Sequence, residues 1–397
     1  MGKGSCAGEL VEARSSVVSR RRFPSYLVAV VVLGAFAFAQ SGPRVQISHT
    51  KENLRGVSTV SREIAWASGT HGTYLRTTDG GHTWTAAQVP DAGALDFRGV
   101  VAFSADEAFL MSAGVGEQSR IYHTADGGQH WQLQFSNRNP KGFFDSIAFW
   151  DSKHGVVVGD PVADESGQLK FEVLITEDGE KWRAIPPSHL PVAMEGEGAF
   201  AASNTCIAII PGADLNVWFA TGGKVARVFH SADRGQTWEV FDTPILHGPD
   251  SAGIFSIAFR NAIDGVIAGG DYKHPRNDGP DLAFTHDAGK TWELSAIHPQ
   301  AYFSAVAYDR RVEQEAKREQ WAEAKAELGG KKTQVKPVPP QRLFVVGQDF
   351  ILDFGPPNNP RRIGGKKKLG LGFNAVSAYP EGGALVVGPN GSIAFVP

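Results

Sequence analysis

Cysteine is scarce in this chain, with two residues among 397. Two cysteines cannot make a disulfide framework, and they do not have zinc-ligand spacing. Cys206, beside the apolar run 207–210, is expected to be a buried small side chain rather than a reactive thiol. A G-x-G-x-x-G helix start and a haem-attachment motif are also missing, so nucleotide- and haem-dependent oxidoreductases have no support. We therefore predict no cofactor and no metal site.

Long hydrophobic runs are missing too. The longest one, Tyr26 to Phe38, is shorter than the ~20 residues of a spanning helix. It follows Arg20-Arg21-Arg22 and ends in Ala37-Phe38-Ala39, an A-x-A cleavage pattern, so residues 1–39 are predicted to be a secretory signal; a membrane anchor is the alternative. Ser19 to Phe23 also resembles a twin-arginine export motif. We expect an exported protein, either periplasmic or extracellular.

The composition that remains is that of a globular β protein. The chain is 42% hydrophobic and 20% charged, with a formal net charge of −3, and it has 46 glycines and nine tryptophans. Many glycines and large aromatic side chains are expected where tight turns alternate with short packed strands. A protein partner is predicted, and a nucleic-acid partner is not.

An eight-residue pattern recurs along the chain: Ser or Thr, any, Asp, any, Gly, any, Thr, Trp. Residues 77–84, 231–238 and 285–292 are complete copies; 124–131 has His130 in the threonine place, and 176–182 is one residue short. The tryptophans are 47, 51, 56 and 54 residues apart, which is the period of a four-stranded propeller blade. These segments are Asp-boxes.

The Asp-box residues are interpreted as structural. The carboxylate can accept N–H groups across the turn, glycine supplies positive φ, and the tryptophan fills space between blades. A repeat spaces the carboxylates around a ring, whereas a catalytic or calcium site needs several of them together. The residues are Asp79, Trp84, Asp126, Trp131, Asp178, Trp182, Asp233, Trp238, Asp287 and Trp292.

The strand pattern predicts a single seven-bladed β-propeller over residues 40–397. In the first blade, strands are expected at 55–60, 64–68, 73–77 and 84–88. Further inner strands are expected at 97–103, 144–149, 199–203, 254–259, 302–307 and 373–378. The last blade lacks an outer strand, so the segment Val45 to His49 should complete it and close the ring.

With these boxes and this period, residues 45–397 resemble the photosystem II stability and assembly factor family of Asp-box (BNR) propellers. The resemblance implies a non-enzymatic assembly chaperone or protein-interaction scaffold in an exported compartment. We separately expect the protein to be a monomer. A charged insertion in the sixth blade departs from the family, and no residue indicates photosynthesis. The resemblance therefore transfers only the expectation that the chain binds a protein.

Binding residues are expected on the face opposite the boxes, where long loops gather at 159–170, 186–198, 242–253 and 270–281. Two of these loops open alike, with Gly159-Asp160 and Gly270-Asp271 directly after apolar strands. The alternative is that both aspartates cap their own turns. The candidate ligand residues near the channel mouth are Asp160, Asp271, Tyr272, Lys273, His274, Arg276, Glu195 and Glu197.

Two carboxylates are also the minimum for cleaving a glycosidic bond, so a glycoside hydrolase or sialidase-like enzyme is the alternative function. Sialidases on Asp-box propellers carry an Arg-Ile-Pro motif and an arginine cluster. Neither is visible here, because Arg361-Arg362-Ile363-Gly364 lacks the proline and lies near the C-terminus. No catalytic residue is assigned.

The sixth blade carries an insertion and a basic run. Residues 310–340 are helix-forming by composition in their first part, with Glu313 and Lys317 at i,i+4 spacing. The blade has no Asp-box, and a basic run replaces it. This patch could attract an acidic partner or an anionic membrane, or could serve solubility alone. Its residues are Arg361, Arg362, Lys366, Lys367 and Lys368.

Overall fold

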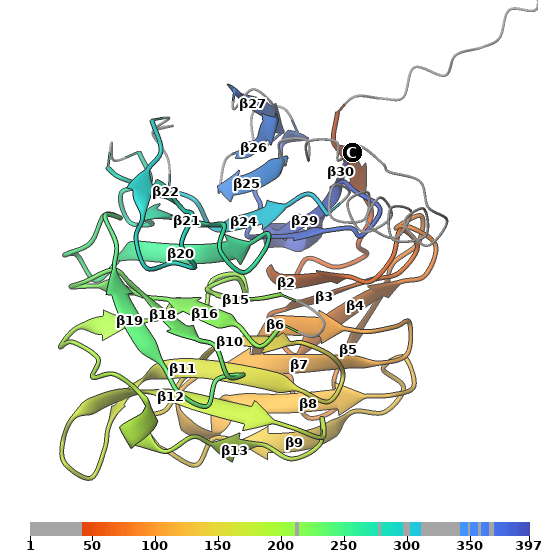
Figure 1. Cartoon of the computed structure of the whole chain (residues 1–397). Coiled ribbons are helices and arrows are strands. Elements are labelled where there is room, and N and C mark those ends of the chain that lie inside the picture. The colour runs from red at the N-terminus through yellow and green to blue at the C-terminus, as the bar shows by residue number, and fades with distance from the viewer. Residues whose placement is uncertain are drawn as a thin grey trace, which may run out of the picture. The chain divides into compact units, whose positions relative to one another are not determined.

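The computed structural model describes residues 42–210, 214–276, 279–296, 302–310, 342–347, 350–355, 359–364 and 369–397. Antiparallel strands in seven sheets make up the fold, so the predicted all-β, seven-bladed propeller is confirmed (Figure 1). Six sheets have four strands, and one carries two additional short strands at its inner edge. The predicted signal, 1–39, lies outside the described residues, as does the insertion after Arg310.

The first three blades follow the chain without interruption. Blade 1 contains β2 (Leu54–Thr59), β3 (Ala65–Gly69), β4 (Thr73–Thr77) and β5 (Thr85–Gln88). Blade 2 contains β6 (Asp96–Ala102), β7 (Ala108–Ala113), β8 (Arg120–Thr124) and β9 (Gln132–Ser136). Blade 3 contains β10 (Phe144–Phe149), β11 (Gly155–Ala163), β12 (Leu169–Thr176) and β13 (Arg183–Ala184).

Blades 4 to 6 are less regular. Blade 4 contains β15 (Ile207–Ile209), β16 (Val217–Ala220), β18 (Arg227–Ser231) and β19 (Glu239–Asp242). Blade 5 contains β20 (Ala252–Phe259), β21 (Gly265–Asp271), β22 (Leu282–Thr285) and β23 (Glu293–Leu294), extended by β14 (Glu197–Gly198) and β17 (Gly222–Gly223). Blade 6 contains β24 (Ala305–Tyr308), β25 (Leu343–Gly347), β26 (Phe350–Gly355) and β27 (Asn359–Gly364).

The last blade joins the two ends of the described chain. Its strands are β28 (Ala375–Ala378), β29 (Ala384–Gly388), β30 (Ser392–Val396) and β1 (Arg44–Gln46). β1 pairs antiparallel with β30, with Val45 opposite Ala394. Gln46 then links this blade to the first one, because its amide accepts a hydrogen bond from Trp84 Nε1 at 2.9 Å and donates one to the carbonyl of Gly80 at 3.1 Å.

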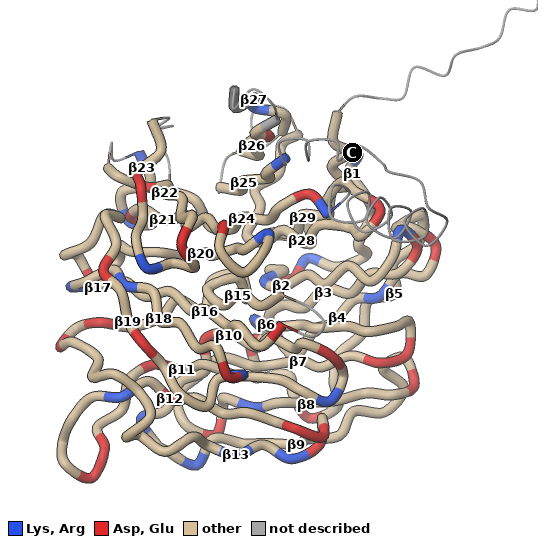
Figure 2. Tube along the Cα trace, in the orientation of Figure 1, with Lys and Arg blue, Asp and Glu red and all other residues tan. Residues whose placement is uncertain are grey.

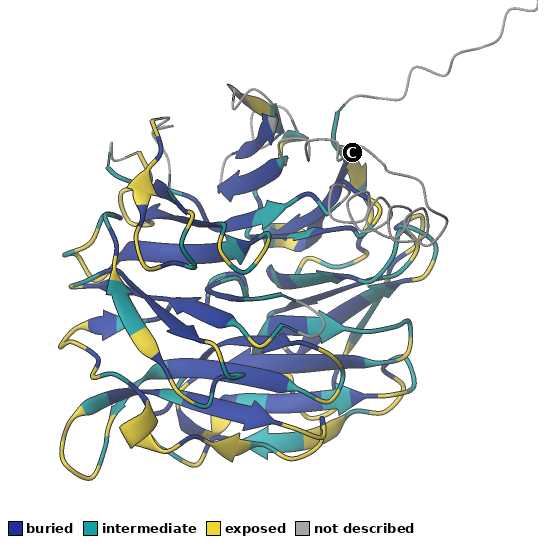
Figure 3. Ribbon diagram, in the orientation of Figure 1, coloured by how far each residue is buried: buried dark blue, intermediate teal, exposed yellow. Residues whose placement is uncertain are grey.

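Burial is greatest in the second strand of most blades and least in the outer strand (Figure 3). Strands such as β3, β7 and β25 are buried along their whole length, whereas β13 and β23 are exposed. The apolar clusters lie between neighbouring blades, as where Leu54 and Leu75 of blade 1 pack with Leu385 and Val387 of blade 7. The core is therefore a ring of interfaces between sheets.

Two local predictions are wrong. Residues 199–203 are not an inner strand; they form no strand, and β15 is the inner strand of blade 4. Residues 159–170 are not one long loop, because β11 and β12 pair as far as Ala163 and Leu169. Apolar and polar residues alternate too briefly in both stretches to tell a strand from an extended crossing segment.

Candidate functional site

The site is built on a four-residue motif at the start of the inner strands: apolar, any residue, small, apolar. The copies are 54–57, 97–100, 144–147, 254–257, 303–306 and 373–376. The small residue is needed because the strands crowd at the axis; a Cβ on Gly56 would come within 2.9 Å of the carbonyl oxygen of Arg98. The second position of the motif, where any residue is allowed, is therefore the one that can carry a functional side chain.

In four blades this position is a β-bulge. The register of the inner strand shifts around Arg55, Arg98, Asp145 and Phe255. A bulge leaves one residue out of the ladder and re-aims its side chain. Because inner strands begin on the face opposite the Asp-box turns, these four residues stand at one mouth of the central channel.

Two of the bulged residues are arginines that share one carboxylate. Arg98 Nε donates to Asp96 Oδ2 at 2.9 Å, and an Nη atom of Arg55 lies 3.6 Å from the same oxygen. Burial lowers the pKa of Arg55, which Asp96 partly offsets. One carboxylate thus serves two guanidinium groups, and about a quarter of each arginine side chain is exposed.

The residues wrongly predicted as a strand cross this mouth instead. We call Ala199–Thr205 the crossing segment. Its carbonyl at Ala201 accepts a hydrogen bond from Arg98 Nη1 at 2.7 Å, and Asn204 bonds both backbone groups of Ile147 in blade 3. Ser203 Oγ reaches blade 6, where it donates to the carbonyl of Ser304 at 2.9 Å. The segment therefore ties blades 2, 3 and 6 together.

Blade 3 contributes buried carboxyl groups beneath this segment. Asp145 is 1% exposed, and burial together with the charge of Asp160 holds its pKa well above the ordinary value, although Arg98 and the N–H of Ala201 oppose the shift. Burial raises the pKa of Asp160 to about 6, while the N–H of Ala199 donates to its carboxylate at 3.0 Å. Burial also raises the pKa of Glu172. This side of the mouth can hold protons near neutral pH.

Aromatic rings line the mouth on the side of blades 5 and 6. Phe255 stacks on Phe200 of the crossing segment, with centroids 4.2 Å apart. Tyr302 and Tyr272 meet Phe255 edge to face at 5.6 and 6.1 Å. Tyr272 is 45% exposed, so it offers an amphipathic surface beside the charged half of the mouth.

The two Gly-Asp steps are not equivalent in the structure. Gly159 pairs with Phe144 just before the bulge of blade 3, and Gly269 pairs with Ile254 at the same place in blade 5. Asp160 therefore corresponds to Gly270, and Asp271 lies one residue further on. Burial disfavours ionisation of Asp271, yet hydrogen bonds from His274 and from nearby backbone groups lower its pKa overall. Asp271 caps its own turn.

The other predicted ligand residues divide into two groups. Tyr272, Lys273, His274 and Arg276 are exposed on the loop after β21. Glu195 is also exposed, but Glu197 is buried and forms an ion pair with Arg227, whose Nε lies 3.0 Å from its Oε1. The carboxylate of Glu197 is thereby used within the fold.

Only part of the predicted basic patch is described. Arg361 and Arg362 lie on β27, while Lys366, Lys367 and Lys368 are outside the described residues. Arg361 lies 3.2 Å from Asp353, which also receives two bonds from Arg342, and Arg362 lies over the ring of Phe350. Figure 2 shows basic and acidic residues interspersed along the rest of the trace.

The Asp-boxes have the geometry of a self-contained turn. In the first box, the Asp79 carboxylate accepts the Thr83 hydroxyl at 2.6 Å and its N–H at 2.9 Å, and Gly80 and Gly81 have positive φ. The Thr83 hydroxyl and N–H are the main reasons that the pKa of Asp79 falls to about 2. The same side-chain-to-turn bonds recur at Asp126, Asp178, Asp233 and Asp287.

The described residues offer few candidates for a reactive thiol or a metal site. Cys206 is buried at the small position of blade 4, and burial raises its thiol pKa to about 12. Within the described ranges, no three His, Cys, Asp or Glu side chains are grouped as metal ligands. No helix in the same ranges is long and apolar enough to cross a membrane.

The fold and the boxes define an Asp-box β-propeller. The model of the photosynthesis system II assembly factor YCF48 family matches residues 39–143, from β1 into the turn before blade 3. YCF48 bound to a D1 peptide has a similar structure (TM-score 0.60, 16% identity, 90% of this chain and 96% of that one). YCF48 from Cyanidioschyzon merolae is similar too (TM-score 0.57, 16% identity, 89% of this chain and 98% of that one). The predicted resemblance to this family is thus confirmed.

The same fold is shared more widely. The WD40 propeller domain of Doa1 covers 89% of this chain and 95% of its own with a TM-score of 0.56 at 9% identity. A comparison with curated proteins gives no significant match.

The sequence pattern missed the arginines and Asp145 because a bulge interrupts the alternation of inward and outward residues. A signal was nevertheless present: Leu54-Arg55-Gly56-Val57 and Phe97-Arg98-Gly99-Val100 are nearly the same tetrapeptide, one blade apart. An arginine between an apolar residue and glycine in an inner strand is unexpected for packing alone.

Proposed function

We propose that this chain is an exported, non-enzymatic propeller that binds a segment of a protein partner at the channel mouth and acts as an assembly factor or scaffold in the cell envelope. The observation that carries the proposal is the set of bulges that places Arg55, Arg98 and Phe255 at one mouth. A rigid ring that directs charged and aromatic side chains to one point suits recognition of an extended segment.

The chemistry of the mouth favours an acidic group on the partner. Two guanidinium groups share the carboxylate of Asp96, which leaves about one positive charge for a side-chain or terminal carboxylate. Tyr272 beside them can pack on apolar parts of the same segment. A YCF48 structure of similar fold is one bound to a D1 peptide, which supports a peptide ligand here.

The proposal also covers export, oligomeric state, ring closure and the charged segments of blade 6. Residues 1–39 direct export to the periplasm or exterior, the propeller acts as a monomer, and β1 keeps the ring closed. The charged insertion 310–340, for which a helix is predicted, lies beyond the described residues after Arg310. The basic run with Arg361 and Arg362 adds contacts to an acidic partner or an anionic membrane.

Affinity capture of the exported protein tests the proposal. The wild-type protein should retain a defined envelope protein, and Arg55→Gln with Arg98→Gln should lose it while the melting curve keeps its cooperativity. Gln substitution of exposed Arg183 and Lys181 in blade 3 is a control of equal charge change. Equal retention by the double arginine variant would place binding elsewhere.

A glycan-active enzyme is the second candidate, and one observation favours it. Asp160 has a pKa of about 6, which suits a general acid, and it has Asp145 as a carboxyl neighbour. A broad glycan hydrolysis screen with wild type and Asp160→Asn is the test. Activity abolished by Asp160→Asn would put the enzyme first.

A further inference from the structure

The Asp-box tryptophans fill one kind of space in this propeller. Each packs with its own blade against the preceding one: Trp84 lies in the cluster of blades 1 and 7, Trp238 in that of blades 3 and 4, and Trp292 in that of blades 4 and 5. Trp131 meets Trp66 of blade 1 edge to face at 6.3 Å. An indole is therefore the side chain that blades 1 to 5 use at their box-face interfaces, whereas the cluster between blades 6 and 7 contains no tryptophan among the described residues.

Blade 6 supplies no such tryptophan. By register, Phe354 takes the place of Thr285, which begins the box of blade 5, and none of the eleven residues after Phe354 is tryptophan. The apolar cluster between blades 5 and 6 includes Val266, Leu343 and Phe354, and it contains no tryptophan among the described residues.

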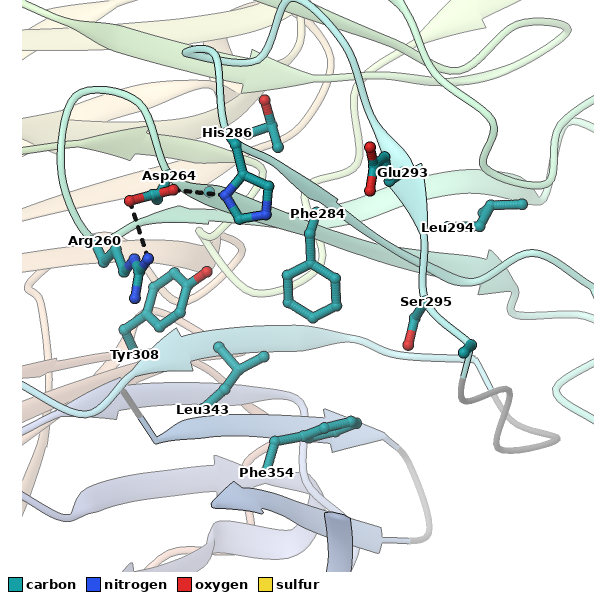
Figure 4. Close-up of a pocket in the computed structure, with 13 residues that line it drawn as sticks. Arg260, Asp264, Phe284, His286, Glu293, Leu294, Ser295, Tyr308, Leu343 and Phe354 are labelled. Atoms are coloured by element: carbon teal, nitrogen blue, oxygen red, sulfur yellow. Dashed lines mark hydrogen bonds and ion pairs between the residues drawn. The ribbon is translucent and has the colours of Figure 1, made fainter. Parts of the chain in front are cut away.

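A cavity of about 440 Å³ lies at this interface (Figure 4). Phe284 projects into it from blade 5, and Tyr308, Leu343 and Phe354 form the opposite wall. Its volume is within the range of ligand sites, ~300–1,000 Å³.

The wall from blade 6 also departs from the other blades. In blade 5 the ring of Phe259 lies over Gly265, so that a Cβ there would come within 2.6 Å of it. Leu343 takes the place of Gly265, and Tyr308 takes the place of Phe259. Because leucine occupies the space above the strand, the Tyr308 ring cannot pack there in the same way. Both side chains face the cavity instead.

The rim offers a hydrogen-bond acceptor. Asp264 is held by Arg260 Nη2 at 3.0 Å and by His286 Nδ1 at 2.7 Å, so its charge is matched. Glu293 is exposed beside the opening. Four of the five box tryptophans, all but Trp131, donate their indole N–H to an oxygen, as Trp292 does to the carbonyl of Gly289 at 2.9 Å.

From these observations we infer that the cavity between blades 5 and 6 binds a tryptophan side chain presented by a protein partner, with its indole N–H directed to Glu293. The partner thereby supplies at this interface the indole that blades 1 to 5 take from their own Asp-box. This site lies on the box face, so it is independent of the proposed channel-mouth function.

The test measures the binding of N-acetyl-Gly-Trp-Gly-amide to the full chain by ligand-observed NMR. We expect saturable binding, weaker by roughly tenfold or more for the peptide with Leu in place of Trp. Glu293→Trp at the exposed rim and Leu343→Trp in the wall should each block binding, and Glu293→Gln should weaken it. Glu293 lies opposite Phe284 on the face of the sheet that borders the cavity. The exposed Glu293→Trp variant guards against misfolding of the buried Leu343→Trp variant.

Leu215→Trp is the matched control, because Leu215 lines a smaller cavity, of about 240 Å³, between blades 3 and 4. It should leave binding unchanged. Equal affinity for the Trp and Leu peptides, or full binding in Glu293→Trp, would overturn the inference. Binding that is seen only after residues 311–341 are replaced by a short Gly-Ser linker would also overturn the inference. That result would mean that the chain itself covers the cavity in the unaltered protein.

Discussion

Arg98 and Asp96 are joined at 2.9 Å on the inner strand of blade 2, and the same carboxylate oxygen faces Arg55 of blade 1 at 3.6 Å. This arrangement places two guanidinium groups around one negative charge. Their mutual repulsion is tolerated because Asp96 lies between them.

Asp96→Asn should therefore lower the free energy of unfolding by about 1 to 3 kcal/mol, since two partly buried arginines lose their shared counter-ion. Urea denaturation measures this. Asp106→Asn is the control, because Asp106 is 70% exposed and 3.6 Å from Arg76. Equal small effects for both variants would mean that Asp96 does not hold the pair.

Asp160→Asn should stabilise the protein above neutral pH. Its pKa is raised to about 6 from 3.8, so the folded protein prefers the protonated form and wild-type stability falls as pH rises through this window. The variant avoids that loss, on the order of 2 to 3 kcal/mol above pH 7. Below about pH 4 the two proteins should be equally stable. A difference that persists in acid would contradict the burial of this carboxyl.

Asp79→Ala should have the opposite pH dependence. The pKa of Asp79 is lowered to about 2 from 3.8, so its bonds stabilise the fold above pH 4 and are lost as pH falls toward 2. Melting curves should show a deficit at pH 6 that disappears at pH 2. Asp242→Ala, at an exposed position on β19, serves as control and should show no such dependence.

Gln46→Ala tests whether β1 holds the ring closed. Gln46 binds Trp84 Nε1 and the carbonyl of Gly80, just as Gln134 binds Trp182 Nε1 and the carbonyl of Gly179 within the ring. Each substitution should cost about 1 to 3 kcal/mol, because a partly buried N–H loses its acceptor. If Gln134→Ala destabilises and Gln46→Ala does not, β1 is not firmly docked.

Replacing the five basic residues 361, 362 and 366–368 with Gln should abolish salt-sensitive binding to anionic vesicles or acidic envelope proteins. The fold should persist, since Arg342 keeps two bonds to Asp353 without Arg361. Sedimentation at two salt concentrations measures this. Retention that is equal for both proteins and independent of salt would reduce the patch to a solvated surface.

Much of this fold could be predicted because it repeats. The Asp-box spacing indicated four-stranded blades, the seven expected inner strands indicated seven of them, and β4 and β10 have the predicted bounds. What could not be predicted depends on contacts between distant residues. The position of the crossing segment is fixed by its own residues Asn204, which bonds to blade 3, and Ser203, which bonds to blade 6. The one-residue offset between Asp160 and Asp271 comes from strand register, and similar dipeptides do not reveal it.

The channel mouth is the proposed binding site for a segment of a protein partner. The most direct measurement is photo-crosslinking in the envelope with a benzophenone amino acid in place of Tyr272, beside the aromatic rings of the mouth. Gln129, exposed in an Asp-box turn on the other face, is the control position. We expect one crosslinked partner from position 272, and this crosslink should disappear with Arg55→Gln and Arg98→Gln. Crosslinks of equal yield from position 129, or crosslinks from 272 that survive loss of both arginines, would contradict it.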